Sequence, residues 1–252
     1  MVSILRVVSF PKSGRTWLRV MLDDLSIEAV YTHDGSGYED HASIATLNAD
    51  KTKYAAGSIL LMVRDPRDIV VSGYFQARRR LRLGSADSLS MSDFIRDERY
   101  GIEKVVRFNL QWFAAAPQIS RFAIVQYEDL HKNTGRTLSA VARFAGSEKP
   151  AEAMADVVSQ RSLAHMRRLE ASGALEQQYG SALMPADPSD PESYKVRRGI
   201  IGGYVDYLSG RDVEYCDRIL GNAGYFPQLR EALAARSVLR FGEAPFPAPN
   251  FA

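Results

Sequence analysis

The stretch SILRVVSFPKSGRTWLR, residues 3–19, decides how this chain folds. Its first part is apolar in the manner of a buried strand over Ile4–Ser9, and its last part opens an amphipathic helix expected over Thr16–Glu28. Between them lies a turn with a lysine, a glycine and hydroxyl side chains. A helix start presents unpaired N–H groups and the positive end of the helix dipole, and both attract phosphate. The stretch therefore predicts a P-loop-like phosphate site made of strand, loop and helix.

Composition sets the limits of the class. The chain has 252 residues, 46% of them apolar, which suits a single α/β domain spanning 1–252. A net charge of +2 is too small to indicate bulk nucleic-acid binding. The only cysteine, Cys216, excludes an intramolecular disulfide and a cysteine-rich zinc site. No signal peptide and no run of the ~18 apolar residues that span a bilayer is present. We expect a cytoplasmic protein with no metal, nucleic-acid or membrane partner.

Two more strands are predicted, over Ser58–Val63 and Arg121–Gln126. Strands that are separated by helices predict an α/β fold with a central parallel sheet flanked by helices. Ligands of such sheets bind at the carboxyl ends of the strands. We therefore expect the chemistry of this protein in the loops that follow the strands.

The other segments are expected to be helical, apart from three stretches. Residues 31–57 are polar and turn-rich with a short helix near Ile44, residues 171–195 form a mobile loop, and 241–252 are an irregular tail. The expected helices are Asp68–Leu83, Ser92–Ala115 (one helix or two, capped by Ser92), Thr134–Ala145, Glu152–Arg168, Val213–Ala223 and Leu229–Ala235.

Cations occupy two further positions at the expected edge of the sheet. The second strand ends in Arg64, whose planar guanidinium suits phosphate, and Ser72 follows about two turns into the next helix. After the mobile loop, Arg197, Arg198 and Gly199 form a basic turn that is suited to close on an anionic ligand. The sequence thus predicts one anionic ligand held from several loops.

These segments resemble the PAPS-dependent sulfotransferases, whose donor is 3′-phosphoadenosine 5′-phosphosulfate. Phe10–Trp17 is similar to the family's 5′-phosphosulfate loop, and Arg64–Ser72 is similar to its 3′-phosphate motif. Arg197–Gly199 resembles the family's late Arg-Lys-Gly segment, and Tyr127–Leu130 matches its Tyr-Glu-Asp-Leu element. The resemblance spans roughly residues 9–204 and indicates a compact, bacterial-type member that needs no metal and releases 3′,5′-ADP.

The resemblance implies a role for each residue of these motifs. Lys12 would contact the bridging and 5′-phosphate oxygens and stabilise the leaving phosphate. The other implied donor-binding residues are Ser13, Gly14, Arg15 and Thr16 around the 5′-phosphate, Trp17 on the adenine, Tyr127 near the nucleotide, and Arg64, Ser72, Arg197, Arg198 and Gly199 around the 3′-phosphate. Arg15 departs from the family, which often has threonine or asparagine there, and adds positive charge beside the donor.

Transfer also requires a base for the substrate hydroxyl or amine, and histidine suits this role near neutral pH. The family places Lys/Arg-Thr/Ser-His between its first loop and its 3′-phosphate strand, and residues 31–34, Tyr-Thr-His-Asp, take that place. We expect His33 to be the base with the following aspartate as its neighbour, and His41 to be the reserve candidate. His131 and His165 are expected to be structural or surface residues.

Two other functions compete with this interpretation. A P-loop kinase or NTPase would need a late Gly-Lys-Ser/Thr motif, which is absent. A non-catalytic nucleotide-binding protein would keep Lys12 and Arg64 but would need no base at His33.

The acceptor pocket and the oligomeric state stay open. Variable loops, here 31–57, 78–100 and 171–195, build such pockets, and we expect a small-molecule, glycan or glycopeptide acceptor. The basic run Arg78–Arg82 is either a solvated face or lies at the acceptor mouth, where it would favour an anionic acceptor.

Overall fold

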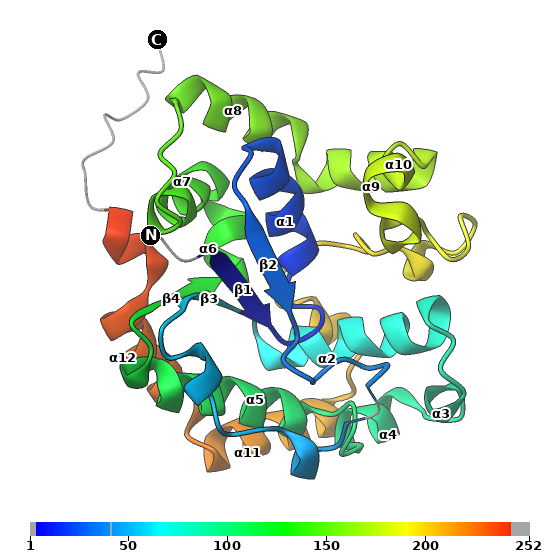
Figure 1. The fold of residues 1–252 in the computed structure, drawn as a ribbon. Coiled ribbons are helices and arrows are strands. Elements are labelled where there is room, and N and C mark those ends of the chain that lie inside the picture. The colour runs from blue at the N-terminus through cyan, green and yellow to red at the C-terminus, as the bar shows by residue number, and fades with distance from the viewer. Residues whose placement is uncertain (1–3, 41, 243–252) are drawn as a thin grey trace.

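A computed structural model describes residues 4–40 and 42–242. Its centre is a four-stranded sheet of parallel strands in the order β2-β1-β3-β4 (Figure 1). The strands are β1 (Leu5–Ser9), β2 (Ala29–Thr32), β3 (Ser58–Val63) and β4 (Arg121–Gln126). Helices cover both faces, so the predicted parallel sheet flanked by helices is confirmed.

The edge strand β2 is absent from the sequence-based prediction. The first helix was expected to run to Glu28, but it ends at Asp24. Ser26 takes a left-handed φ of 52°, and the N–H of Ile27 donates to the carbonyl of Leu22 at 2.9 Å, which closes the helix. The chain then pairs with β1. Because β2 is partly exposed, it lacks the apolar run that marks β3 and β4, whose predicted bounds are confirmed.

The helices alternate with the strands as expected. They are α1 (Arg15–Asp24), α2 (Pro66–Phe75), α3 (Gly84–Asp87), α4 (Met91–Arg96), α5 (Ile102–Ala115), α6 (Tyr127–Lys132), α7 (Thr134–Phe144), α8 (Ala151–Gln160), α9 (Leu163–Ser172), α10 (Glu176–Tyr179), α11 (Gly210–Asn222) and α12 (Tyr225–Arg236). The expected short helix near Ile44 is a 3₁₀ turn, Ile44–Thr46.

Three expected helices are divided or shortened. The helix expected over 68–83 is α2 followed by a π-helical turn, Gln76–Arg80. The segment 92–115 forms α4 and α5, and its cap is Ser90 rather than Ser92, because Ser90 makes a capping box with Asp93. The segment 152–168 is split between α8 and α9.

The loop expected over 171–195 is more regular than predicted. It holds the end of α9, the short helix α10 and the 3₁₀ turns Gly180–Leu183 and Pro191–Ser193. At the tail, residues 241–242 belong to the 3₁₀ turn Val238–Gly242, and 243–252 lie outside the described residues.

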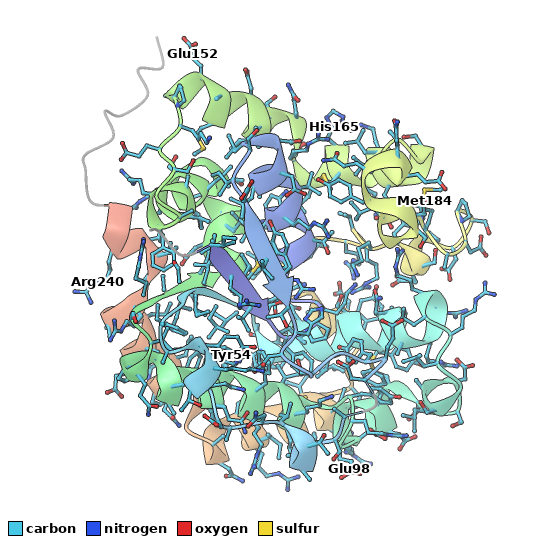
Figure 2. All side chains as sticks on the ribbon, in the orientation of Figure 1. Tyr54, Glu98, Glu152, His165, Met184 and Arg240 are labelled. Atoms are coloured by element: carbon cyan, nitrogen blue, oxygen red, sulfur yellow. The ribbon has the colours of Figure 1, made fainter. Side chains whose placement is uncertain are left out.

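Alternate side chains of the strands fill two cores. Leu60 and Met62 of β3 face the layer with α1, α7 and α8, whereas Ile59, Leu61 and Val63 face the layer with α2, α5 and α12. Every residue of β3 is buried, and Figure 2 shows side chains filling the space on both sides of the sheet. The sheet therefore supplies a rigid base for the loops at its carboxyl edge.

The strand order also creates a switch point. From β1 the chain passes to β2 on one side, and then returns to β3 on the other side of β1. The loops that follow β1 and β3 consequently leave the sheet in opposite directions, and a crevice forms between their starting points. The predicted phosphate loop and Arg64 both begin there.

Candidate active site

The loop after β1 is a tight turn that opens α1. Lys12 has a positive φ of 72°, and Gly14, the N-cap of α1, has a φ of 94°. A Cβ atom on Gly14 would lie 2.5 Å from the ring of Tyr127. Only glycine fits this position, because other side chains meet both the strained backbone conformation and the aromatic ring.

Lys12 is held in place by a contact from the π-helical turn that follows α2. Its Nζ donates to Gln76 Oε1 at 3.0 Å. Burial lowers the pKa of Lys12 well below its usual value, and repulsion from Lys195, Arg80 and Arg197 lowers it further. A buried ammonium among other cations gains free energy when an anion binds beside it.

Arg64 joins the phosphate loop to the late basic segment. Its Nη2 donates to the carbonyl of Ile200 at 3.0 Å and lies 3.3 Å from Asp68 Oδ2. Its guanidinium lies 4.4 Å from the centre of the Tyr127 ring, a cation–π contact. Ser72 lies further along α2, is buried, and lines the same cavity as Arg64.

Two carboxylates, one buried and one half-buried, fix the backbone around Arg64. Asp68 accepts hydrogen bonds from the N–H groups of Gly202 and Tyr204, at 2.9 and 3.0 Å. Glu128 accepts one from the N–H of Asp65 at 2.9 Å, and burial raises the pKa of this carboxyl. These bonds give Asp68 and Glu128 a structural role, because each carboxylate holds the backbone of a segment next to Arg64.

The late basic segment contributes two arginines and a glycine. Arg197 Nη1 bonds Glu192 at 2.8 Å and the hydroxyl of Tyr207 at 2.7 Å, while Arg198 pairs with Asp206 at 2.7 Å. Gly199 has a φ of 66°, and a Cβ there would lie 2.7 Å from the side chain of Leu163. The segment lines the cavity opposite the phosphate loop.

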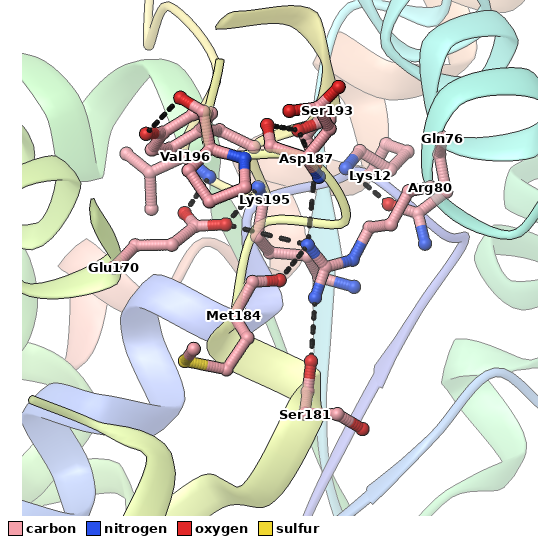
Figure 3. Close-up of polar contacts among 12 residues, drawn as sticks. Lys12, Gln76, Arg80, Glu170, Ser181, Met184, Asp187, Ser193, Lys195 and Val196 are labelled. Atoms are coloured by element: carbon pink, nitrogen blue, oxygen red, sulfur yellow. Dashed lines mark hydrogen bonds and ion pairs between the residues drawn. The ribbon is translucent and has the colours of Figure 1, made fainter. Parts of the chain in front are cut away.

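Figure 3 shows what holds the segment before Arg197. Arg80 Nη1 lies 3.4 Å from Glu170 Oε1 and donates to the carbonyl of Met184 at 2.5 Å, and Nη2 donates to Ser181 at 2.9 Å. The fully buried Glu170 accepts hydrogen bonds from the N–H groups of Lys195 and Val196, at 2.5 and 2.8 Å. This ion pair thus connects the π-helical turn after α2 to the segment that precedes Arg197 and lines the cavity.

The basic run Arg78–Arg82 therefore has mixed roles. The expectation of a solvated face is wrong for Arg80, whose side chain is only 8% exposed, and holds for Arg79, at 61%. Lys195 also lines the cavity. No role was predicted for it from the sequence, although it lies in the same basic segment as Arg197. Burial lowers the pKa of Lys195 to about 8, with further repulsion from Arg80 and Arg15.

His33 follows β2 and lies beside the phosphate loop. Its Nδ1 is 2.8 Å from the carbonyl of Ser9, and its Nε2 is 2.9 Å from Arg15 Nη2. Burial, together with the charge of Arg15, lowers the pKa of His33 to about 3. The imidazole is thus neutral, as a base must be before it takes a proton.

The expected partnership between His33 and Asp34 is wrong. Asp34 turns away to Lys51 Nζ at 2.6 Å and to the hydroxyl of Tyr54 at 2.6 Å, because a buried carboxylate needs a charged or hydrogen-bonding partner. It anchors the loop that carries His33. His41 lies outside the described residues.

The remaining histidines lie away from this loop. His131 packs against the rings of Trp17 and Tyr127, at 6.4 and 5.8 Å between ring centres, and His165 lies on α9. Trp17 is buried and donates from its indole nitrogen to the carbonyl of Arg161 at 2.6 Å. Its ring is also edge-on to Tyr127, with the centres 6.2 Å apart.

One cavity brings the predicted site residues together. Ser13 is the exception, because its side chain is buried and its hydroxyl donates to the carbonyl of Phe10 at 3.0 Å. The predicted residues that line the cavity are Lys12, Gly14, Arg15, Thr16, Trp17, His33, Arg64, Ser72, Tyr127, Arg197, Arg198 and Gly199.

The cavity is positively charged and suits an anionic ligand. Its lining holds an excess of positive charge over the carboxylates of Glu39 and Asp68. Three of its guanidinium groups have a buried nitrogen without a hydrogen-bond partner, namely Arg15 Nη1, Arg64 Nε and Arg197 Nε. Buried donors of this kind cost free energy until a partner arrives, so the site fits a ligand with several anionic oxygens.

The described residues hold neither a cluster of metal ligands nor a helix that spans a membrane. No group of three or more histidine, cysteine, aspartate or glutamate side chains within 4–40 and 42–242 could hold a metal ion. In that part of the chain, no helix is both long and apolar enough to cross a membrane.

Solved structures share this fold. Mouse sulfotransferase SULT7A1, crystallised with PAP, superimposes with a TM-score of 0.67 over 92% of this chain and 87% of its own, at 18% identity. Retinol dehydratase in complex with androsterone and PAP gives a TM-score of 0.61 over 96% of this chain and 82% of its own, at 14% identity. At these identities the likeness is one of fold.

Sequence comparison identifies the family. A guinea-pig (Cavia porcellus) 3-alpha-hydroxysteroid sulfotransferase is 23% identical over 88% of this chain and 84% of its own length. Human sulfotransferase 2A1 is 20% identical over 84% of this chain and 81% of its own. The model of the sulfotransferase domain matches residues 38–229, which is well over half of the sequence. The chain belongs to the sulfotransferase family, and it is an enzyme of sulfonate transfer.

Proposed function

We propose that this sulfotransferase moves the sulfuryl group of 3′-phosphoadenosine 5′-phosphosulfate to a hydroxyl group of a small molecule. The cavity with its unpaired guanidinium nitrogens carries this proposal, because it offers cations at two separate places. The similar solved structures are complexes with PAP, which supports the same donor here.

The two groups of cations suit the two anionic ends of such a donor. Lys12, Arg15 and the N-terminus of α1 form one group, and they would bind the 5′-phosphosulfate end. Arg64 and Arg198 form the other group and would bind the 3′-phosphate together with the hydroxyl of Ser72. The adenine would lie between these two groups of residues, where Tyr127 and Trp17 would contact it.

Catalysis would then rest on position and electrostatics. Sulfuryl transfer resembles phosphoryl transfer in spreading charge over equatorial and leaving oxygens. Lys12 would stabilise the charge that builds on the leaving phosphate. His33 would take the proton of the attacking hydroxyl through Nε2, since Nδ1 already donates to the carbonyl of Ser9.

The region beside His33 would receive the acceptor. It is lined by Gly37, Tyr38, Glu39, Gln76 and Leu81. Two of the similar proteins are hydroxysteroid sulfotransferases, which supports an alcohol as the acceptor class. Glycans and glycopeptides also carry alcohol groups, so they should be tested as acceptors beside small-molecule alcohols.

Thermal stabilisation tests the donor site. Saturation with 3′,5′-ADP at about a hundred times its Kd should add about 2.7 kcal/mol to the free energy of unfolding. ATP with Mg²⁺ should add less, because it lacks a 3′-phosphate for Arg64. A larger effect of ATP with Mg²⁺ would favour the kinase alternative.

Transfer itself is tested with donor that carries radioactive sulfate. The protein is incubated with a panel of alcohols, amines and glycans, and labelled products are counted. Binding of 3′,5′-ADP without any labelled product would favour a non-catalytic nucleotide-binding protein.

A further inference from the structure

Arg15 determines the hydrogen bonding of the proposed base. A guanidinium can only donate, so the 2.9 Å contact between Arg15 Nη2 and His33 Nε2 requires Nε2 to accept. Nδ1 then carries the proton that it donates to the carbonyl of Ser9, 2.8 Å away. This is the tautomer that a base needs, but its lone pair is occupied. In this arrangement Nε2 cannot take a proton from a substrate hydroxyl.

The guanidinium of Arg15 itself lacks an anion. Its Nη1 is buried without a hydrogen-bond partner, and Arg15 makes no salt bridge within the described part of the chain. Burial, together with repulsion from the neighbouring Arg19, lowers the pKa of Arg15 to about 10. Arg15 is also the first residue of α1, directly after Gly14 in the phosphate loop. Its charge therefore lies where the loop is built to receive an anion.

Three cations act on His33. Arg15, Lys195 and Lys12 all oppose its protonation, whereas the hydrogen bond to the carbonyl of Ser9 favours it. An anion in the phosphate loop would reverse this balance in two ways. It would neutralise these cations, and it would offer Arg15 a charge-assisted bond stronger than one to a neutral imidazole.

We propose that Arg15 is a positioning residue that couples filling of the phosphate loop to release of the His33 Nε2 lone pair. The inference rests on the proposed function, because it takes the 5′-phosphate end of the donor as the anion. In the free protein Arg15 lies on Nε2 and holds the imidazole in the Nδ1–H tautomer. When the loop is filled, Arg15 turns to the anion, which binds this arrangement more tightly and so shifts the population toward it. The base is exposed only when there is a donor to attack.

Nitrogen NMR of the histidine rings tests this coupling directly. The protein is labelled with ¹⁵N-histidine, and His33 is assigned with the variant His33→Asn. In the wild type, 3′,5′-ADP should move the Nε2 resonance toward that of a lone pair without a hydrogen bond, and raise the His33 pKa by about one unit or more.

Variants separate the switch from the general effect of a bound anion. In Arg15→Thr the Nε2 lone pair is free from the start, so the ligand should move its resonance little. Arg15→Lys keeps the positive charge but lacks the planar set of guanidinium donors. It replaces Arg15→Thr in this test if the threonine variant is unstable. Arg19→Thr removes an equal charge one turn further along α1, where Arg19 pairs with Asp23. It should behave like the wild type.

Two results would overturn the coupling. One is a wild-type Nε2 resonance that saturating 3′,5′-ADP leaves in place, and the other is an equal displacement in Arg15→Thr. The backbone amides of the phosphate loop report binding of 3′,5′-ADP in the same titration. Binding without displacement refutes the coupling alone, whereas absence of binding refutes the proposed donor site.

Discussion

The carboxylate of Glu170 accepts the backbone N–H of Lys195 at 2.5 Å, which fixes a cavity cation through its main chain. The same carboxylate lies 3.4 Å from Arg80 Nη1, and Glu170 is fully buried. A carboxylate on α9 and an arginine after α2 thus hold the segment that closes the site (Figure 3). Stability and ligand binding are coupled at this point.

Glu170→Gln should therefore impair both properties. It removes the negative charge that pairs with the buried Arg80, and we expect a loss of about 3 kcal/mol in the free energy of unfolding. Affinity for 3′,5′-ADP should fall as well, because Lys195 loses its anchor. Chemical denaturation and calorimetric titration measure the two effects. The matched control is Glu176→Gln, an exposed glutamate of α10. Unchanged ligand affinity in Glu170→Gln would argue against this role.

Gly14→Ala should abolish binding at the phosphate loop. The added Cβ would lie 2.5 Å from the Tyr127 ring on a backbone with a φ of 94°, so the loop must move. Titration with 3′,5′-ADP measures the loss. Gly135→Ala on α7 is the control, since the nearest atom to its Cβ is 3.9 Å away, and it should bind normally. Equal affinities in the two variants would refute the tight packing described here.

Lys12→Met should lower turnover by about two to three orders of magnitude, because the charge that builds on the leaving phosphate loses its nearest stabilising cation. Steady-state rates of sulfate transfer at saturating donor give this number. Lys132→Met, at the exposed end of α6, removes a lysine remote from the cavity and should keep the full rate. A Lys12→Met enzyme with near-normal turnover contradicts the role.

His33→Asn should cost about two to four orders of magnitude in turnover, the range of a general base. The affinity for 3′,5′-ADP should stay within a few-fold of the wild type, because the proposed role of His33 is toward the acceptor and not the donor. Rates and calorimetry on the same preparation separate these effects. His165→Asn on α9 controls for loss of an imidazole. If only His165→Asn were slow, the base would have to be sought elsewhere.

Binding of 3′,5′-ADP should take up protons between about pH 8 and pH 10. The pKa of Lys195 in the free protein is about 8, and that of Lys12 is also lowered. Bound anions favour the protonated amines and raise both pKa values, so the complex holds more protons than the free protein in this range. Affinity should therefore fall as the pH rises above about 8.

Calorimetry in buffers of different ionisation enthalpy measures this proton uptake. The phosphates of the ligand are already ionised above pH 8 and contribute little. Lys195→Met should show a smaller uptake than the wild type. An uptake that this substitution leaves unchanged would assign the protons to other groups.

The sequence by itself determined the parallel sheet and the loop chemistry. β3 and β4 are continuous apolar runs, which buried parallel strands require. The turn after β1 carries its phosphate-binding chemistry within a few adjacent residues, and the cationic ends of the other segments follow the strands. Local pattern suffices for such features, because neighbours in sequence are also neighbours in space.

Only the tertiary structure decided which charges meet. β2 is a strand because β1 offers it an edge, and Arg80 is buried because Glu170, remote in sequence, lies opposite it. Likewise, the contact of Arg15 with His33 depends on the closure of the helix before β2. A pKa, a hydrogen-bond partner or an ion pair depends on distances between segments far apart along the chain, and these distances exist only in the folded molecule.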